Sequence, residues 1–489
     1  MISLLEVAER AHVTGPKMDE QQRDLAMFKK MRELVKRHNL EYQGPVDVME
    51  VPDEYADRAF QAAVDFLVDI GIYCVDTNRS IIFSEEEVWR AAKEAPREIS
   101  IGEGKDRRTV YTRDYEDLRP PLIRGDGHRP YPEDAGERMM RCFAQIPRTD
   151  IVEGFNFTTI EGREIRGLPA EVYATRREAS LMREAVRSAG RAGLSITLYP
   201  ISTRPAALVA AMDPENCLRK SDGILLSLLP EVKCESGMLA AAIAYEGYGA
   251  YKVNGAGFSL IGGYCGGPEG AIIESICQTL AAWLVYRDSI HYTLSVEGYI
   301  TRRGMSVISP EPAVTSGKKP PLWTTLIPNN AIRRNTNIIR WSAMLGGQIA
   351  GGEAGSTSSF LSQAGSVIAS TVFGLHLVGG QIPFEVSFAG EVSDATLKAR
   401  IKREEVPKIL DKLDQNVIKA LKTEGHPISQ QQRNRDTVRE PRILAYENWN
   451  EYYNRLSKSY DFVRGLPTKS CLENYEKAKK ELIELGLPL

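Results

Sequence analysis

The chain has 489 residues, of which 43% are hydrophobic and 26% are charged. These fractions are typical of a soluble globular protein with a large buried core. The formal net charge is only −3, with both signs mixed along the chain, so we expect neither nucleic acid nor a membrane surface as a partner. The length fits either about three ordinary domains or one barrel with extensions.

Neither a leader nor a membrane span is predicted. The opening residues, MISLLEVAERAHVTG, place Glu6, Glu9 and Arg10 inside the apolar run, which is not typical of a signal-peptide core. The longest uncharged stretch, residues 354–384, is interrupted by Ser, Thr, Gly and Gln and lacks the run of about 18 apolar residues that a span needs. We therefore expect a cytoplasmic protein.

The cysteines and histidines follow no metal-binding or disulfide pattern. The seven cysteines are widely spaced and include no CxxC pair, and the six histidines form neither HxH nor HExxH. We expect no disulfide framework, no metal site and no tightly bound cofactor.

Residues 1–125 are predicted to form an N-terminal helical extension. An amphipathic helix is expected over 19–40, and a second is expected to open at Asp53 as its N-cap. Ser84 and Glu87 have the spacing of a capping box at the start of a third helix. Two extended pieces are predicted at 98–102 and 108–112. Residues 120–132, which are rich in Pro, Gly and Arg, are predicted to form a loop.

The middle of the chain alternates apolar strands with helices. The strands are predicted at 149–162, 193–201, 223–234, 250–261 and 290–300. Near-continuous apolar strands separated by helices indicate a parallel sheet covered on both faces. At least five such units in one run favour a closed (β/α)8 TIM barrel, which we place at 126–395 as the catalytic domain. The charged segment 396–489 is predicted to be a C-terminal helical extension.

The stretch LIGGYCGGPEGAIIES, residues 260–275, raises the question of a phosphate cradle. It follows a predicted strand and precedes a helix, but it contains neither GxGxxG nor GxxxxGK[ST]. Pro268 also removes an N–H where a phosphate would need donors. We therefore predict a tight turn at the barrel mouth whose missing side chains leave room for a bulky group.

Six segments resemble the monomethylamine:corrinoid methyltransferases. IGGYCGG is similar to their FGGYAGG, GIYCVDT (71–77) to GIYCTDT, and KKELIELGL (479–487) to KKLEDLGL. AYEG (244–247), PEVK (230–233) and GEAGST (352–357) are similar to HYKG, NELK and LEASAQ. The six matches run in order from about residue 71 to the C-terminus.

This resemblance implies a barrel enzyme that moves a methyl group from a methylated amine to Co(I) of a separate corrinoid protein. The corrinoid would be supplied by that partner. The resemblance also implies a homo-oligomer, with a hexamer as one form. The glycine loop would face the corrinoid through Gly262, Gly263, Gly266 and Gly267.

The chain departs from the family at its pyrrolysine. That position falls on Ala207 or Leu208, neither of which can form an adduct with an amine. The substrate is then either monomethylamine-like or a quaternary or larger N-methyl compound, because an amine leaves well only as a cation or with a donated proton. Candidate substrate-binding residues at the predicted strand ends are Tyr199, Asn254, Tyr264 and Glu297.

Glu231 and Glu353 are the candidate catalytic carboxylates. Glu231 ends the apolar run LLSLLP, where burial would raise its pKa and suit it to donate a proton or balance a cation. The alternative for Glu231 is a salt bridge with Lys233. The alternative for Glu353 is a charge at a helix N-terminus, and Asn254 and Tyr264 are alternatively a turn residue and a packed ring.

Two other functions remain open at this stage. One is a barrel lyase or hydrolase that kept the scaffold but no longer uses a corrinoid. The other is a non-catalytic binding or scaffold protein, which would also account for the missing pyrrolysine.

Overall fold

The computed structural model describes residues 2–42, 51–125, 130–154, 156–157, 159–254, 259–260, 263–287, 290–293, 295–296, 320–342, 352–426 and 448–489. These residues form two compact units, and each is described by itself. Unit 1 comprises Met1–Ile99, Thr203–Pro205 and Leu225–Trp341. Unit 2 comprises Ser100–Ser202, Ala206–Ile224 and Ser342–Leu489.

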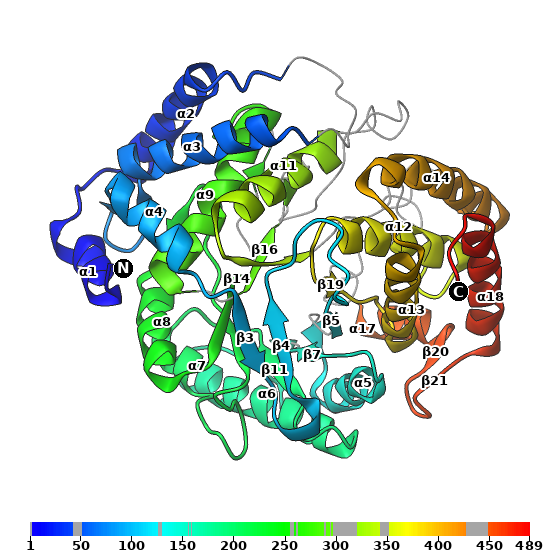
Figure 1. Cartoon of the computed structure of the whole chain (residues 1–489). Helices are drawn as coiled ribbons and strands as arrows, with labels where there is room; N and C mark the ends of the chain where they lie inside the picture. The colour runs from blue at the N-terminus through cyan, green and yellow to red at the C-terminus, as the bar shows by residue number, and fades with distance from the viewer. Residues whose placement is uncertain are drawn as a thin grey trace. The chain divides into compact units, whose positions relative to one another are not determined.

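Unit 1 packs helices against neighbouring strands (Figure 1). Its helices are α1 (Leu4–Glu9), a short π-helix (Arg10–Thr14), α2 (Glu20–Arg37), α3 (Asp53–Asp69), α4 (Glu85–Glu94), α8 (Ser236–Tyr248), α9 (Pro268–Tyr286) and α11 (Pro320–Asn335). The strands β14 (Tyr251–Asn254), β16 (Ile290–Thr293) and β18 (Ile339–Ser342) are neighbours in that order, and β14 runs parallel to β16. Helix α9 contacts α3, α11 and β16, and it is buried at every residue from Gly270 to Tyr286. An all-round apolar helix is stable only in such a position.

A small sheet in unit 1 ties the N-terminal helices to the middle of the chain. Strand β1 (Ile72–Cys74) pairs antiparallel with β2 (Arg79–Ile81) and parallel with β13 (Lys233–Cys234). The register places Tyr73 opposite Lys233. Strand β13 begins two residues after Glu231, so this sheet fixes one side of the segment that carries the candidate carboxylate.

Unit 2 contains a parallel sheet with helices between its strands. The strand order is β19 (Leu377–Val378), β5 (Ile123–Gly125), β7 (Ile151–Glu153), β11 (Ser195–Leu198), β12 (Gly223–Leu225). All four pairings are parallel. The helices are α5 (Glu133–Gln145), α6 (Leu168–Ser188), α7 (Pro205–Val209), α12 (Thr357–Val372), α13 (Pro383–Ala399), α14 (Val406–Thr423), α17 (Trp449–Ser457) and α18 (Lys469–Glu484).

The remaining elements are short. They are β3 (Glu98–Ile101), β4 (Arg108–Tyr111), β6 (Pro130–Tyr131), β8 (Asn156–Phe157), β9 (Thr159–Ile160), β10 (Arg163–Glu164), β15 (Ser259–Leu260), β17 (Ser295–Val296), β20 (Tyr460–Asp461), β21 (Leu466–Pro467) and two 3₁₀ turns (Gly104–Asp106, Arg403–Glu405). Within the described ranges, no helix is both long enough and apolar enough to cross a membrane.

The predicted α/β fold of the TIM-barrel type is confirmed: parallel strands alternate with helices, and all five predicted strand segments contain a strand. The capping box of Ser84 and Glu87 is present at the start of α4. Asp53, in contrast, is the first residue of α3, and Pro52 is the N-cap.

The loop predicted over residues 120–132 needs correction. Strand β5 lies inside the stretch 120–132 that was predicted to be a loop, and it precedes the predicted start of the barrel at residue 126. It has only three residues, and its central Arg124 is buried in an ion pair with Glu153, so hydropathy does not reveal it. Helix α13 spans residue 395, and the domain limits 1–125, 126–395 and 396–489 stay predictions.

Candidate active site

Glu231 lies at the tip of a tight hairpin that follows β12. The hairpin is closed by backbone hydrogen bonds from Leu229 N–H to the Lys233 carbonyl at 2.9 Å and from Lys233 N–H to the Leu229 carbonyl at 3.4 Å. Glu231 and the next residue, Val232, have left-handed backbones, with φ of 58° and 55°. That conformation costs about 1–2 kcal/mol per residue and is unusual for a β-branched side chain. Surrounding groups must therefore hold the hairpin in place.

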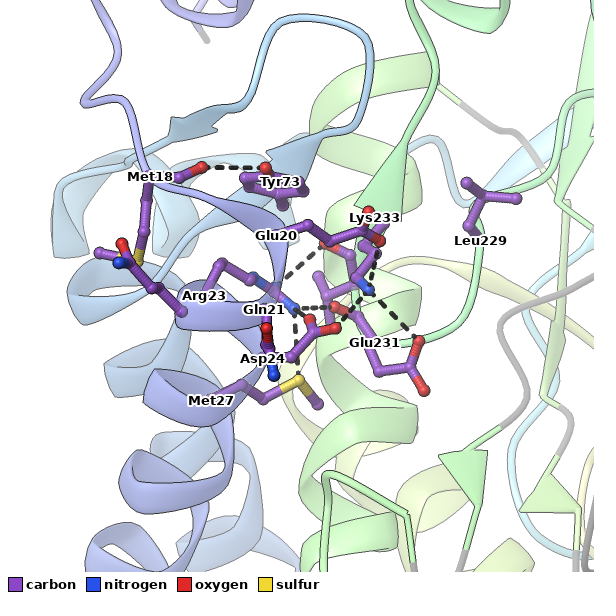
Figure 2. Close-up of polar contacts among 12 residues, drawn as sticks. Met18, Glu20, Gln21, Arg23, Asp24, Met27, Tyr73, Leu229, Glu231 and Lys233 are labelled. Carbon is purple, nitrogen blue, oxygen red and sulfur yellow. Dashed lines mark hydrogen bonds and ion pairs between the residues drawn. The ribbon is translucent and has the colours of Figure 1, made fainter.

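Two buried side chains hold the Glu231 peptide from opposite sides. Arg23 on α2 donates to the carbonyl oxygen of Glu231 and, at 3.3 Å, to that of Val232 (Figure 2). Glu274 on α9 accepts the Glu231 N–H at 3.0 Å through Oε1. Arg23 and Glu274 are only 1% and 2% exposed. Water therefore competes little for these hydrogen bonds.

Lys233 is the cation beside the Glu231 carboxylate. Its Nζ lies 2.8 Å from Asp24 Oδ2, 2.9 Å from Glu20 Oε1 and 3.8 Å from Glu231 Oε2 (Figure 2). Asp24 and Glu20 are both closer to Lys233 than Glu231 is, so the Glu231–Lys233 salt bridge is the weakest of the three contacts. The Glu231 side chain is 22% exposed. Burial raises its pKa above the ordinary value although Lys233 opposes the change, as its position after an apolar strand predicted.

Glu274 is a titratable group in its own right. Burial raises its pKa from 4.5 to about 7, with a further rise from the Glu231 charge; the Glu231 N–H, the Cys265 thiol and Arg23 act in the opposite direction. A carboxyl group whose pKa is higher in the folded than in the unfolded protein stabilises the fold fully below pH 4.5. That contribution is lost as the pH rises through about 7.

We expect the free energy of unfolding to fall between pH 5 and pH 8 by up to about 3 kcal/mol through Glu274, at ~1.36 kcal/mol per pKa unit. Glu274→Gln should make this fall smaller, because the amide does not titrate. Urea unfolding of the wild type and the variant at both pH values measures the difference. Equal pH dependence in the two proteins would contradict the assignment.

Unit 2 carries a separate polar cluster at its strand ends. Tyr199 directly follows β11, and its hydroxyl donates to Glu153 Oε1 at 2.7 Å. The same carboxylate oxygen is paired with Arg124 of β5. Glu153 ends β7, so the three residues lie on neighbouring strands and all three are buried. The carboxyl ends of barrel strands are where active sites are built.

A sequence profile of the family described as "Monomethylamine methyltransferase MtmB" matches residues 2–417, most of the chain. The chain belongs to this family. It is a methylamine methyltransferase by family, and its fold is that of the solved members. The crystal structures of a hydroxylamine MtmB complex and of the Methanosarcina barkeri MtmB each superpose with a TM-score of 0.78, at 23% and 22% identity, over 99% of this chain and 98% of theirs.

Relatives in the MtmB family are distant in sequence but similar in length. MtmB2 of Methanosarcina acetivorans is 25% identical over 98% of this chain and 97% of its own length. MtmB of Methanosarcina mazei is 28% identical over 58% of this chain and 61% of its own. The resemblance seen in the six short segments is thus confirmed over nearly the whole chain.

The glycine stretch of this MtmB-family chain is bare for two local reasons. Gly266 has a left-handed backbone, φ 82°, and donates its N–H to the Gly263 carbonyl at 3.0 Å. A Cβ on Gly270 would overlap the Cys265 carbonyl oxygen and lie 2.9 Å from its carbon. Gly267 is the N-cap of α9, and the Glu269 carboxylate lies against it. A phosphate would meet negative charge there, in line with the absence of a nucleotide motif.

The position compared with the family's pyrrolysine lies in helix α7. Ala207 and Leu208 are both fully buried. Neither side chain carries a group that reacts with an amine.

The other candidates occupy different surroundings. Asn254 is the buried last residue of β14, not a turn residue: its Oδ1 accepts the Leu228 N–H at 3.3 Å, and its Nδ2 lies 3.3 Å from His291 Nδ1. Tyr264 is 38% exposed, not a packed ring. Glu297 and Gly262 lie outside the described residues.

Glu353 lies in unit 2, in the turn before α12. Its carboxylate is 3.8 Å from Lys458 Nζ, and its side chain is 31% exposed. Ser356 is the N-cap of the helix and bonds the Ser359 N–H, so Glu353 lies outside the first helical turn. Its pairing with a surface lysine marks it as less desolvated than Glu231.

Sequence reasoning missed the residues that hold the candidate site. Glu274 had a signal, since it is the one carboxylate in the apolar run AIIESICQTLAAWLVY. Arg23 had none, because an arginine in a charged amphipathic helix is ordinary. Glu153 and Arg124 could not be recognised either, because each is a charged residue inside a strand of only three residues.

Proposed function

We propose that the chain transfers a methyl group from a methylated amine to Co(I) of a separate corrinoid protein, and that it does so without pyrrolysine. Membership in the MtmB family supports the methyl transfer. The observation that carries the rest is Glu231, a partly buried carboxyl on a strained, firmly held hairpin beside a lysine. Strain of this kind gathers at functional sites.

The chemistry requires a cationic or protonated nitrogen. The N–CH₃ bond breaks with its electron pair remaining on nitrogen, while Co(I) supplies the pair for the new bond to carbon. A quaternary ammonium compound leaves as a neutral amine, and Glu231 as carboxylate would balance its charge. For an uncharged amine, protonated Glu231 would give its proton to the leaving nitrogen. Burial raises the pKa of Glu231, which favours the protonated form more than in an exposed glutamate.

The remaining features of the proposal concern partners. The corrinoid belongs to the partner protein, and no cofactor is bound tightly by this chain itself. A homo-oligomer is expected from the family resemblance, and we also propose that the protein is cytoplasmic. A quaternary or larger N-methyl donor is favoured over monomethylamine, because no adduct-forming side chain is found at Ala207 or Leu208.

The test is a methyl-transfer assay with purified full-length chain. Monomethylamine and tetramethylammonium are offered separately to a corrinoid protein reduced to Co(I), and methyl-Co(III) is followed by absorbance. We expect conversion that depends on the chain with at least one donor. No conversion with either donor would favour a barrel lyase or hydrolase, or a scaffold.

The partly exposed turn around Gly266 is proposed as the docking point of the corrinoid protein. Among the described residues, the nearest atom to a Cβ built there is Phe28 Cε2, at 4.0 Å. Gly266→Phe should raise the KM for the corrinoid protein roughly tenfold while costing about 1 kcal/mol of stability through the left-handed backbone. Gly266→Asn, which accepts this backbone more readily, is the matched control. An unchanged KM in the phenylalanine variant would place docking elsewhere.

A further inference from the structure

The hairpin that carries Glu231 is held by side chains along its whole length. Asn254 Oδ1 accepts the Leu228 N–H at 3.3 Å, and Gln278 Nε2 donates to the Leu229 carbonyl at 3.2 Å. At the tip, Glu274 accepts a hydrogen bond from the Glu231 N–H, and Arg23 donates hydrogen bonds to the carbonyls of Glu231 and Val232. These groups come from α2, α9 and β14.

The contacts of Arg23 and Glu274 differ from the others because they meet the strained residues themselves. Two successive left-handed residues would relax if their carbonyls were free, since the conformation is intrinsically unfavourable. One guanidinium donates to both carbonyls and therefore links their orientations (Figure 2). Arg23 Nη1 also lies 3.5 Å from Asp24 Oδ1, on the same helix that supplies the partners of Lys233.

We propose that Arg23 and Glu274 are positioning residues for Glu231: they clasp the two sides of its peptide, hold the hairpin 229–233 in its left-handed form and so set the direction of the Glu231 carboxylate. This inference rests on the proposed role of Glu231 in methyl transfer. Neither residue touches the substrate in this scheme. Both act only through the hairpin.

A double-mutant cycle separates positioning from a structural role. The rates of Arg23→Gln, Glu231→Gln and the double variant are compared with wild type, with the donor that supports transfer and a corrinoid protein reduced to Co(I). A misplacement of about 1 Å can cost 10²-fold, so Arg23→Gln should lower kcat by about ten- to a hundredfold with Glu231 present. In the Glu231→Gln background it should change kcat by less than about twofold, because no carboxylate is left to position.

Arg113→Gln is the matched control, since Arg113 in unit 2 is also a buried arginine that donates to backbone carbonyls, including that of Leu375 at 2.7 Å. It should lower the melting temperature without changing kcat. If Arg23→Gln does not fold, Arg23→Lys is measured in the same cycle, because lysine keeps the positive charge but has a single donor group. We expect a smaller loss of kcat, again only when Glu231 is present.

The outcomes distinguish the two claims. An equal fold-loss from the Arg23 change in both backgrounds overturns the positioning role while the role of Glu231 stands. A Glu231→Gln variant of near-normal rate overturns the proposed role of Glu231, and the positioning role with it, while methyl transfer itself stands. If Arg23→Gln lowers kcat only when Glu231 is present, the result supports both the positioning role of Arg23 and the role of Glu231.

Discussion

Glu231→Gln should slow methyl transfer by about 10²- to 10⁴-fold, the usual cost of losing a positioned acid or base. This corresponds to about 3–5 kcal/mol of barrier at ~1.36 kcal/mol per tenfold change. Glutamine keeps the shape of the side chain but can neither balance a cation nor release a proton. Its backbone hydrogen bonds to Arg23 and Glu274 do not depend on the side chain, so the hairpin should persist.

The stability of this variant should change little. Lys233 retains its closer contacts with Asp24 and Glu20, and a partly exposed ion pair contributes about 0–1 kcal/mol. Glu20→Gln is the matched control, because it removes a carboxylate from the same lysine without touching the hairpin tip. Conversion of Co(I) to methyl-Co(III) and melting curves are measured for both variants. If Glu231→Gln is as fast as Glu20→Gln, the assignment is wrong, and Glu353 is the next carboxylate to test.

Much of the fold could be predicted because its signals are local. Strands β11 and β14 lie in extended segments that alternate with helices along the chain, and helix α4 begins with a capping box that lies within four residues. Strand β5 could not be predicted in this way. It is three residues long, and its buried arginine is paired with Glu153, which is 29 positions further along the chain and lies on the neighbouring strand.

The candidate site could likewise be predicted only where its signals are local. The partial burial of Glu231 could be predicted, because Glu231 follows an apolar run in the sequence. Its left-handed backbone could not, because nothing in Pro-Glu-Val announces a positive φ. The conformation depends on Arg23, more than 200 residues earlier, and on Glu274, 43 residues later in helix α9. Contacts of such long sequence separation leave no pattern in either partner.

The glycine stretch yields the other large effect: Gly270→Ala should cost about 3 kcal/mol of stability, the upper end of ordinary overpacking. Its new Cβ would overlap the backbone oxygen of Cys265, which cannot rotate away as a side chain would. Either the first turn of α9 or the turn at 263–267 must shift. Gly247→Ala in helix α8 is the matched control. Among the described residues, no atom beyond the neighbouring helix backbone lies within 4 Å of a Cβ built there, so the better helix propensity of alanine should stabilise by about 0.5–1 kcal/mol.

The damage in Gly270→Ala should also reach catalysis, because the displaced residue belongs to the network below Glu231. The Cys265 thiol is hydrogen-bonded to Glu274, and Glu274 accepts the Glu231 N–H. Moving Cys265 therefore disturbs the group that holds one side of the hairpin. We expect a loss of kcat that exceeds that of Gly247→Ala at a temperature where both proteins are folded, measured together with urea unfolding. A Gly270→Ala protein with unchanged unfolding midpoint would mean that the first turn of α9 relaxes freely, and its glycine would then need another explanation.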